Sequence, residues 1–357
     1  MSGPALPGGG PPPPRPTIND VAALAGVSKG AVSMAFNGRP GVSEATRARV
    51  LAAAGALGWE PSLSARALSG ARVDTVGLAI DRPARMLGLE PFYMEFISGI
   101  ESVLADHGAS LLLRVVGGPD EEIEVQRTWW RSRQVSGAIL VDFRRGDRRP
   151  AEIAALGMPV VAVGHPTLTG GLPAAWTDDA AAVGDAVRYL AALGHRRIAR
   201  VGGAAELGHT AIRSAAFEAA ANELGLEQWT TVETDFSGAE GARATRTLLA
   251  SPRRPTAVVY DNDLMAVAGL SVAAEMGFAV PDDLSLLAWD DSQLCRLTRP
   301  MLSAMSHDVF GFGAEVAGRL LALLGGGRPG AGPVPTPVLT PRGSTAPPRT
   351  ATSSRPG

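Results

Sequence analysis

Three acidic clusters are the residues of this chain that could carry out chemistry by themselves. They are Asp178-Asp179, Asp261-Asn-Asp263 and Asp290-Asp291. Paired carboxylates serve as acid and base, or as acid and nucleophile, in enzymes that hydrolyse glycosidic bonds. However, Asp179 and Asp263 stand where helices are expected to begin, and acidic residues are ordinary there because the helix start is positive. The sequence therefore favours binding over catalysis.

Other catalytic patterns are missing from the sequence. It has no Gly-rich phosphate loop and no His and Cys spacing typical of a metal site. Cys295 is the single cysteine, so no internal disulfide can form. We expect no catalytic residue, no metal and no cofactor. No apolar run is long enough for a membrane span or a signal peptide, which favours a cytoplasmic protein.

The chemistry that the sequence specifies most clearly lies near its beginning, where a short helix is predicted after Thr17. The Thr17 hydroxyl can accept from a free amide of the first turn. Val21, Leu24 and Ala25 recur at helical spacing, so we expect them to share one buried face. Gly26 can adopt a left-handed conformation without a steric penalty, which predicts a sharp turn after this helix.

A second short helix is predicted to follow this turn, with Ser28 as its cap. Val32, Ala35 and Phe36 would form its inner face. The outward side chains are expected to be Lys29, Gly30, Ser33 and Met34. Two short helices around a tight turn are typical of a helix-turn-helix, whose second helix can enter the major groove of DNA.

A third helix and the charge distribution support this interpretation. Ser43 can cap a helix on which Val50, Ala54 and Leu57 share a face. Residues 1–72 contain seven basic and three acidic side chains, a net charge of +4. The whole chain carries −2, so the remainder carries −6. Phosphate attraction supplies most of the sequence-independent affinity for DNA, although three helices around glycine turns also occur in ordinary helical proteins.

The head resembles the LacI/GalR family of bacterial transcriptional regulators. The matching stretches are Thr17-Ile-Asn-Asp-Val-Ala-Ala-Leu-Ala-Gly-Val-Ser, Asn37-Gly, Gly41-Val-Ser-Glu-Ala-Thr-Arg and Leu57-Gly-Trp-Glu-Pro61. The resemblance implies that residues 61–72 are a hinge that folds on DNA and inserts Leu68 into the minor groove. A flexible linker is the alternative for this segment. The expected DNA-contacting residues are Thr17, Ser28, Lys29, Gly30, Ser33, Met34, Asn37 and Leu68.

Two positions depart from the pattern of the family. Many members have arginine where this chain has Met34, and a larger side chain where it has Gly30. Arginine can bind guanine through two hydrogen bonds, which methionine cannot do. Base readout is therefore expected to depend on Lys29, Ser33 and the hinge.

From residue 73 onward, short apolar runs alternate with helical stretches. The predicted strands are 73–80, 110–116, 137–141 and 159–163, followed by 198–201, 230–234, 256–260 and 284–289. Two series of βαβ units predict two doubly wound parallel sheets, one for each lobe of an α/β core. Ligands of such sheets bind beyond the carboxyl ends of the strands, so facing lobes would enclose a small molecule.

This core resembles the periplasmic-sugar-binding-protein-like core of the same family. The matching stretches are Pro91-Phe-Tyr, Ser136-Gly-Ala-Ile-Leu, Leu193-Gly-His-Arg-Arg-Ile, Asn262-Asp-Leu-Met-Ala, Trp289-Asp-Asp and Arg342-Gly-Ser-Thr345. The resemblance implies an effector site made of Phe92, His165, Arg213, Phe236, Asn262 and Asp290. Carboxylate, guanidinium and amide groups would bind hydroxyls, and an aromatic face would pack on a sugar ring.

Each effector residue also has a structural alternative. Asp290 could cap a loop, Asn262 could cap the next helix, Arg213 could pair with an exposed acid, and Phe236 could belong to the core. The apolar series Ile97, Ile100, Val103 and Leu104 could likewise be core or a dimer seam.

The expected layout is a disordered arm (1–16), a helix-turn-helix domain (17–60), the hinge (61–72), a two-lobed effector and dimerisation core (73–345) and a disordered tail (346–357). The function expected from it is that of a regulator, a repressor, which binds a pseudo-palindromic DNA operator as a homodimer or dimer of dimers under control of a sugar-like effector. The alternatives are a cytoplasmic sugar-binding protein and an architectural DNA-binding protein without ligand control.

Overall fold

The computed structural model describes residues 16–37, 40–61, 74–328, 330 and 332–349. They form two compact units, a head that ends before Asp74 and a core that begins there. The predicted arm up to residue 15, the hinge from residue 62 with Leu68, and the tail from residue 350 lie outside the described residues.

The head consists of three helices, α1 (Ile18–Ala25), α2 (Lys29–Phe36) and α3 (Glu44–Leu57). Their starts follow the predicted caps, since Ser28 and Ser43 each accept a hydrogen bond from a first-turn amide. One expectation for α1 is wrong. Leu24 is 57% exposed, and the buried residues of the helix are Val21, Ala22 and Ala25. The cluster between the helices is formed by Val21, Val32, Val50 and alanines, with Phe36 and Trp59 packed against it, and Leu24 lies outside it.

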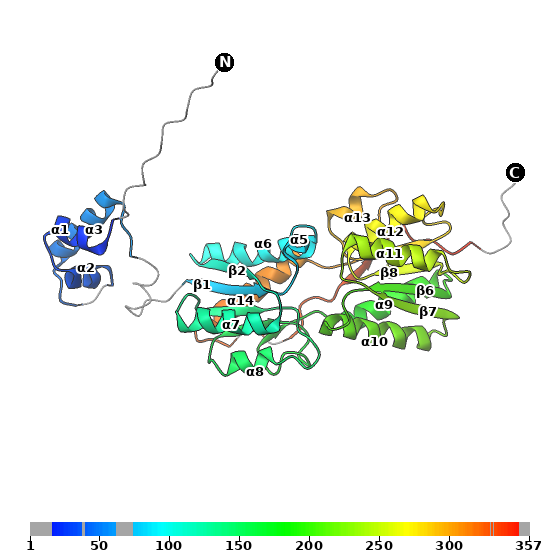
Figure 1. The fold of residues 1–357 in the computed structure, drawn as a ribbon, viewed down its shortest axis with the longest axis horizontal. Coiled ribbons are helices and arrows are strands. Elements are labelled where there is room, and N and C mark those ends of the chain that lie inside the picture. Colours follow the sequence, from blue (N-terminus) through cyan, green and yellow to red (C-terminus); the bar gives the residue numbers. More distant parts are fainter. Residues whose placement is uncertain (1–15, 38–39, 62–73, 329, 331, 350–357) are drawn as a thin grey trace, which may run out of the picture. The chain divides into compact units, whose positions relative to one another are not determined.

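The first lobe is built on a parallel sheet in the order β2-β1-β3-β4-β5 (Figure 1). Its strands are β1 (Thr75–Ile80), β2 (Ser110–Val115), β3 (Gly137–Leu140), β4 (Val160–Val163) and β5 (Ala174–Ala175). Its helices are α5 (Ala84–Leu87), α6 (Pro91–Asp106), α7 (Pro119–Arg131), α8 (Arg149–Ala154) and, from near the end of the chain, α14 (Val309–Leu324).

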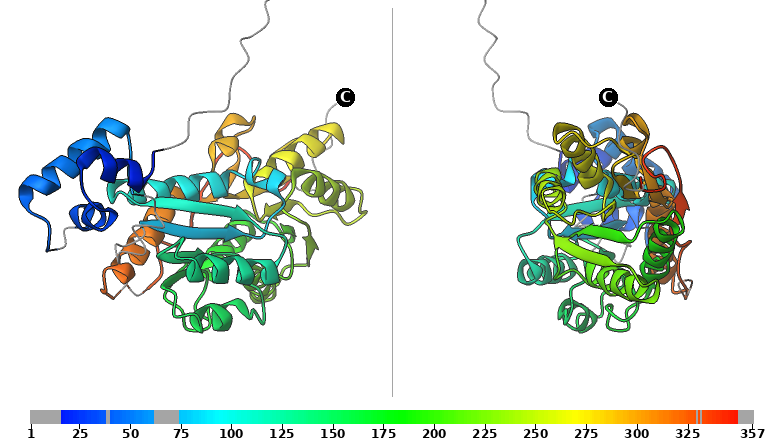
Figure 2. Two further views of the ribbon diagram at one scale, coloured as in Figure 1. Left: turned by 60° about the vertical axis from the view of Figure 1, so that its left-hand side comes forward. Right: turned by 90° about the vertical axis from the view of Figure 1, so that its right-hand side faces the viewer.

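Alternate residues of β1 face opposite helical layers of this lobe. Leu78 and Ile80 pack with α6 and α14, whereas Ala79 packs with α7 and α8, so the sheet is covered on both faces (Figure 2). Ile100 and Leu104 are fully buried in the first of these layers, and Ile97 and Val103 pack against it. The apolar series of α6 therefore belongs to the core of the lobe.

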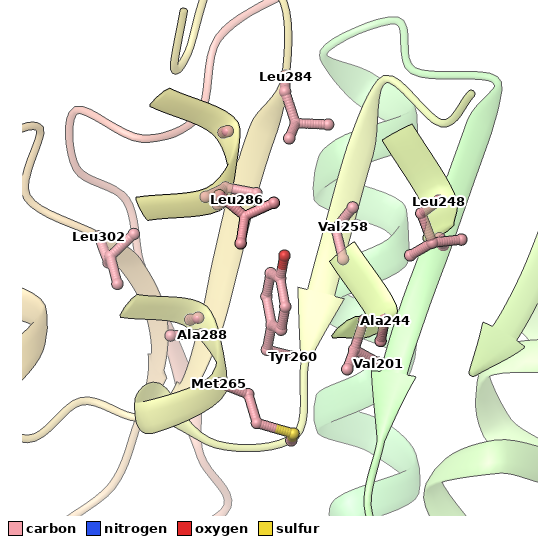
Figure 3. Packing of buried hydrophobic residues seen from close by; sticks show 14 of the residues in the cluster. Val201, Ala244, Leu248, Val258, Tyr260, Met265, Leu284, Leu286, Ala288 and Leu302 are labelled. Carbon is pink, nitrogen blue, oxygen red and sulfur yellow. The ribbon is translucent and has the colours of Figure 1, made fainter. Parts of the chain in front are cut away.

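The second lobe has a six-stranded sheet in the order β11-β10-β9-β8-β6-β7. Its strands are β6 (Arg197–Gly202), β7 (Gln228–Glu233), β8 (Ala257–Tyr260), β9 (Ser285–Asp290), β10 (Ser303–Ser306) and β11 (Val338–Thr340). Its helices are α9 (Asp179–Ala192), α10 (Gly208–Glu223), α11 (Gly238–Leu249), α12 (Asp263–Glu275) and α13 (Gln293–Leu297). Figure 3 shows the layer between this sheet and α11 and α12, where Tyr260, Val258 and Leu286 pack together.

Two features of this lobe differ from the prediction. Strand β11 runs antiparallel to β10 at the edge of the sheet, so the lobe is parallel except at that edge. Strands β10 and β11 were not predicted: β10 reads Ser-Ala-Met-Ser, which is not an apolar run, and β11 has three residues. In the first lobe, the two-residue β5 was likewise not predicted. Residues 346–349, which were predicted to belong to a disordered tail, contact this lobe. His195 Nε2 lies 3.0 Å from the Ala346 carbonyl, and Arg349 pairs with Asp282.

Candidate functional site

A pocket of about 320 Å³ lies between the two lobes of the core. Residues that directly follow strands line it, such as Val141 after β3, Asp261 after β8 and Asp290 at the end of β9. Parallel strands bring their carboxyl ends to one edge of a sheet, so the two facing sheets supply both walls. The walls are mixed in chemistry, with five aromatic rings of phenylalanine and tyrosine beside six acidic side chains.

Arg82, Asp142 and Tyr93 form a bonded group on the wall of the first lobe. Arg82 donates from Nε to Asp142 Oδ2 at 2.9 Å and from Nη2 to Oδ1 at 3.2 Å, and Tyr93 donates its hydroxyl to the same carboxylate. Burial alone would raise the pKa of Asp142, but the Arg82 guanidinium outweighs burial and holds this pKa below its ordinary value. Arg82 follows β1 and Asp142 follows β3, so the sheet itself brings them together.

Arg213 and Asp179 form the corresponding pair in the second lobe. The Nε of Arg213, on α10, donates to Asp179 Oδ2 at 3.0 Å, and its Nη1 donates to the Asp261 carbonyl at 3.3 Å. The guanidinium also lies 4.1 Å from the ring centre of Trp289, a favourable cation–π position. Arg213 thus pairs with a buried acid, not an exposed one, and it still lines the pocket.

Asp290 lies at the end of β9 in a conformation that few residues adopt. Its φ is +77°, and Asp291 follows with +58°. Such left-handed backbone costs on the order of 1–3 kcal/mol per residue and is common at binding sites. Asp290 Oδ1 lies 3.0 Å from His307 Nε2 and its side chain lines the pocket. Asp291 instead turns to Arg342, which it holds through two bonds of 2.6 and 2.7 Å.

Phe236 combines both roles that its sequence position suggested. It is 3% exposed and belongs to the core of the second lobe, yet it also lines the pocket. Its φ is +69°, and the Arg82 guanidinium of the other lobe lies 4.9 Å from its ring centre. His209, whose ring centre lies 5.9 Å away, is half-buried beside it. Burial, together with Arg213, lowers the pKa of His209 to about 4, so its imidazole is neutral near pH 7.

Asn262 holds the site together from behind. Its Oδ1 accepts from the Met265 amide at 2.9 Å, which caps α12, and its Nδ2 donates to the Phe236 carbonyl at 3.0 Å. It is 1% exposed and is absent from the lining of the pocket. Asn262 therefore acts as the cap of α12, as the structural alternative predicted. It does not line the pocket, and it would affect a ligand through Phe236.

Phe92 and His165 both lie at the pocket. Phe92 stacks on His307, with ring centres 6.3 Å apart, near the start of α6. His165 follows β4 and meets the edge of Trp176 at 4.5 Å. The structure therefore brings together Phe92, His165, Arg213, Phe236 and Asp290.

Sequence reasoning missed several residues of the site, namely Arg82, Glu90, Tyr93, Asp142, Asp179, Trp176 and His209. Arg82 and Asp142 each stand just beyond a correctly predicted strand, so the strand-end rule was the signal that could have found them. Glu90 and Tyr93 flank the Pro91-Phe pair, which was used only as a family motif.

Direct contacts also join the lobes beside the pocket. The Gly208 amide donates to the Phe143 carbonyl at 2.7 Å, and Arg144 pairs with Asp81 at 2.6 Å and reaches Glu206 at 4.0 Å. A Cβ on Gly208 would lie 2.4 Å from a Leu168 methyl group and 3.0 Å from the Phe143 carbonyl oxygen, so a larger residue would have to displace Leu168. The two lobes are in contact on that side of the pocket.

In the head, the predicted DNA-contacting residues lie at the surface of α1 and α2. Thr17 and Asp20 form a reciprocal capping box, with bonds of 2.7 Å. Lys29, Gly30 and Ser33 are exposed.

Two further head residues are less exposed. Met34 is half-buried, because its sulfur lies against Gly41. Asn37 ends α2 and donates from Nδ2 to the Ser33 carbonyl at 2.7 Å.

The described residues contain neither a grouped metal-binding set nor a membrane-spanning helix. In that part of the chain, no three His, Cys, Asp or Glu side chains are grouped so that they could hold a metal ion. No helix there is both long and apolar enough to cross a membrane.

Comparison with known proteins places both units. Residues 17–62 match the family described as "Bacterial regulatory proteins, lacI family", and residues 187–345 match "Periplasmic binding protein-like domain". The chain is 32% identical over 314 residues to the HTH-type transcriptional regulator CelR of Thermobifida fusca, covering 86% of this chain and 91% of that protein.

Two solved structures extend the comparison. A CelR–cellobiose complex is 29% identical, with a TM-score of 0.68 over 92% of this chain and 100% of that one. A Lac repressor dimer bound to operator and the anti-inducer ONPF is 26% identical, with a TM-score of 0.79 over 93% and 100% of the two chains.

Proposed function

Because the chain belongs to the LacI family of bacterial regulatory proteins, we propose that it is a repressor whose binding to operator DNA is controlled by a small sugar-like effector. The observation that carries the control by a ligand is the pocket, whose walls come from both lobes. A ligand that contacts both lobes changes the balance between their arrangements only if it binds one arrangement more tightly.

The head supports the DNA-binding half of the proposal. A capped second helix presents Lys29 and Ser33 outward, as recognition by a major-groove helix requires. The Lac repressor structure is a dimer on its operator, and we propose the same assembly on a pseudo-palindromic site for this chain. The expected compartment is the cytoplasm, where that DNA lies.

The pocket supports a polyhydroxylated effector. Asp290 offers carboxylate oxygens, Arg213 offers guanidinium donors, and Phe92 and Phe236 offer apolar faces. These are the groups that bind sugar hydroxyls and the apolar side of a sugar ring. The similar solved structure of a CelR regulator is a complex with cellobiose, which agrees with this class of ligand.

The test is capture of genomic fragments by the purified full chain, followed by sequencing, at about 0.15 M salt. We expect discrete palindromic sites, because two symmetric heads read two half-sites. Mild competition with unrelated DNA should leave those sites bound. Diffuse capture that disappears as salt rises would contradict a site-specific regulator and favour a sequence-independent DNA-binding protein.

A further inference from the structure

Glu90 is the pocket residue whose position neither the capping rules nor the core explains. It stands at the start of α6, directly before Pro91, and its side chain makes no capping bond to that helix. Instead it lines the pocket, where the residue is 6% exposed. A carboxylate at a helix start is favoured by the positive end of the helix, but Glu90 makes no bond to the first-turn amides and lies in the pocket wall instead.

The neighbours of Glu90 do not neutralise it. Arg82 on the same lobe directs its Nε and Nη2 to Asp142, and no hydrogen bond or ion pair joins it to Glu90 among the described residues. Asp290 and Asp142 add negative potential at the same place, and the one hydrogen-bonding neighbour from the second lobe is the neutral Asn262. Burial and these acids raise the pKa of Glu90 to about 7, against the opposing effect of Arg82.

The other basic side chains named in the pocket, Arg213 and His209, do not pair with Glu90 either. Arg213 binds Asp179, and His209 is neutral near pH 7 for the reasons given above. Asp261 is paired from behind with Arg200. Subtracting these pairs leaves Glu90, Asp178 and Asp290 as acids of the lining without an arginine partner among the described residues.

We infer that Glu90 is a specificity-determining residue that accepts hydrogen bonds from hydroxyl or ammonium groups of the effector, and that the pocket selects non-anionic ligands over their phosphorylated counterparts. The inference rests on the proposed function, because it assigns a ligand class to the same pocket. A phosphate here would meet unpaired carboxylates in a partly enclosed space, where like charges repel far more strongly than in water. A hydroxyl or ammonium group would satisfy Glu90 instead.

The first test is a thermal-shift panel on the full chain, at about 10 mM of each compound. The panel contains matched sets: glucose, glucosamine and glucose 6-phosphate; galactose, galactosamine and galactose 6-phosphate; trehalose and trehalose 6-phosphate; and unmodified cellobiose and maltose. We expect stabilisation by at least one neutral or amino member and by no phosphate. Comparing each neutral sugar with its amino counterpart shows whether a hydroxyl group or an ammonium group of the ligand donates to Glu90. Stabilisation by a phosphate, or by no member, would overturn the inference.

The second test compares Glu90→Gln with Glu95→Gln for the ligand that the panel identifies. Glu95 lies on the exposed side of the same helix and does not line the pocket, so it controls for loss of a nearby charge. We expect Glu90→Gln to lose about tenfold in affinity for the unphosphorylated compound, since a bond to a carboxylate is replaced by a neutral one. The ratio of affinities for the unphosphorylated and the phosphorylated compound should also fall in Glu90→Gln. In Glu95→Gln, both the affinity and this ratio should stay unchanged. Unchanged selectivity in Glu90→Gln would refute the role of Glu90.

Failure of this inference can be told apart from failure of the proposed function by measuring operator binding with each compound. A phosphorylated ligand that changes operator affinity would refute the inference and leave ligand control intact. A neutral ligand that binds with the expected selectivity but leaves operator affinity unchanged would support the inference about Glu90 and contradict ligand control of DNA binding.

Discussion

At the scale of single residues, the pocket is built from arginines that are fixed before a ligand arrives. Arg82 and Arg213 are each held by a carboxylate, and the backbones of Phe236 and Asp290 adopt left-handed conformations to reach the pocket. Holding polar groups in place reduces the entropy that a ligand must otherwise remove on binding. Asp290 is the clearest point at which to test the arrangement, since its other contact is a single histidine.

We predict that Asp290→Ala weakens the response to the effector and leaves DNA binding without effector unchanged. A carboxylate that bonds two hydroxyls contributes a few kcal/mol, so at least tenfold more ligand should be needed to change operator binding. Anisotropy of a labelled operator, titrated with the compound identified above, measures this. Asp282→Ala, on the exposed surface of the same lobe, is the control and should respond normally. A normal response from Asp290→Ala would remove Asp290 from the site.

At the scale of elements, α6 and α14 set the geometry of the first lobe's wall. They cross where both carry a glycine. A Cβ on Gly99 would lie 2.0 Å from the Phe310 carbonyl oxygen, and one on Gly313 would lie 2.1 Å from the Phe96 carbonyl oxygen. Helix α6 presents Glu90 at its start, and α14 contributes Phe312 to the pocket. The close crossing therefore fixes two parts of the pocket that are far apart in sequence.

We predict that Gly99→Ala destabilises the core by about 1–3 kcal/mol, because backbone atoms must move to admit the methyl group. Gly318→Ala is the matched control on α14, where nothing lies within 4 Å of the added Cβ. It should be neutral or stabilising by up to about 1 kcal/mol, since alanine favours the helix. Urea unfolding of both variants measures the difference. Equal stability of the two variants would show that the helices can separate at little cost.

At the scale of the whole molecule, buried ionisable groups make the stability of the core depend on pH. Burial raises the pKa of Glu90 and of Glu122 to about 7 each and that of Asp263 to about 6. A carboxyl whose folded pKa is raised stabilises the fold fully below its unfolded pKa, and this contribution is lost as pH rises through the folded value. His209, with its lowered pKa, acts in the opposite direction over more acidic pH.

For Glu90 alone, we predict that the fold loses about 2 kcal/mol of stability between about pH 5.5 and about pH 8, relative to Glu90→Gln. Urea unfolding of both proteins at the two pH values isolates this term, because the other groups are common to both. Glu218→Gln, which removes an exposed carboxylate of α10, should keep the full dependence of the unmodified chain. The same dependence in Glu90→Gln would mean that Glu90 is solvated.

The sequence by itself determined the local features of this protein. The caps Thr17, Ser28 and Ser43, the turn at Gly26 and nearly all the longer strands depend on neighbours within a few residues, so pattern and propensity suffice for them. Family motifs extended this to the two-lobed core and to five residues that the pocket does contain.

Only the tertiary structure decided which groups meet. Arg82 with Asp142, and Arg82 with Phe236, join segments separated by about 60 and about 150 residues, and no local pattern encodes such pairs. No local pattern encodes the exposure of Leu24, the edge position of β11 or the location of Asn262 outside the pocket lining either. Each depends on the space left by distant elements, and that space exists only once the sheets and helices have packed together.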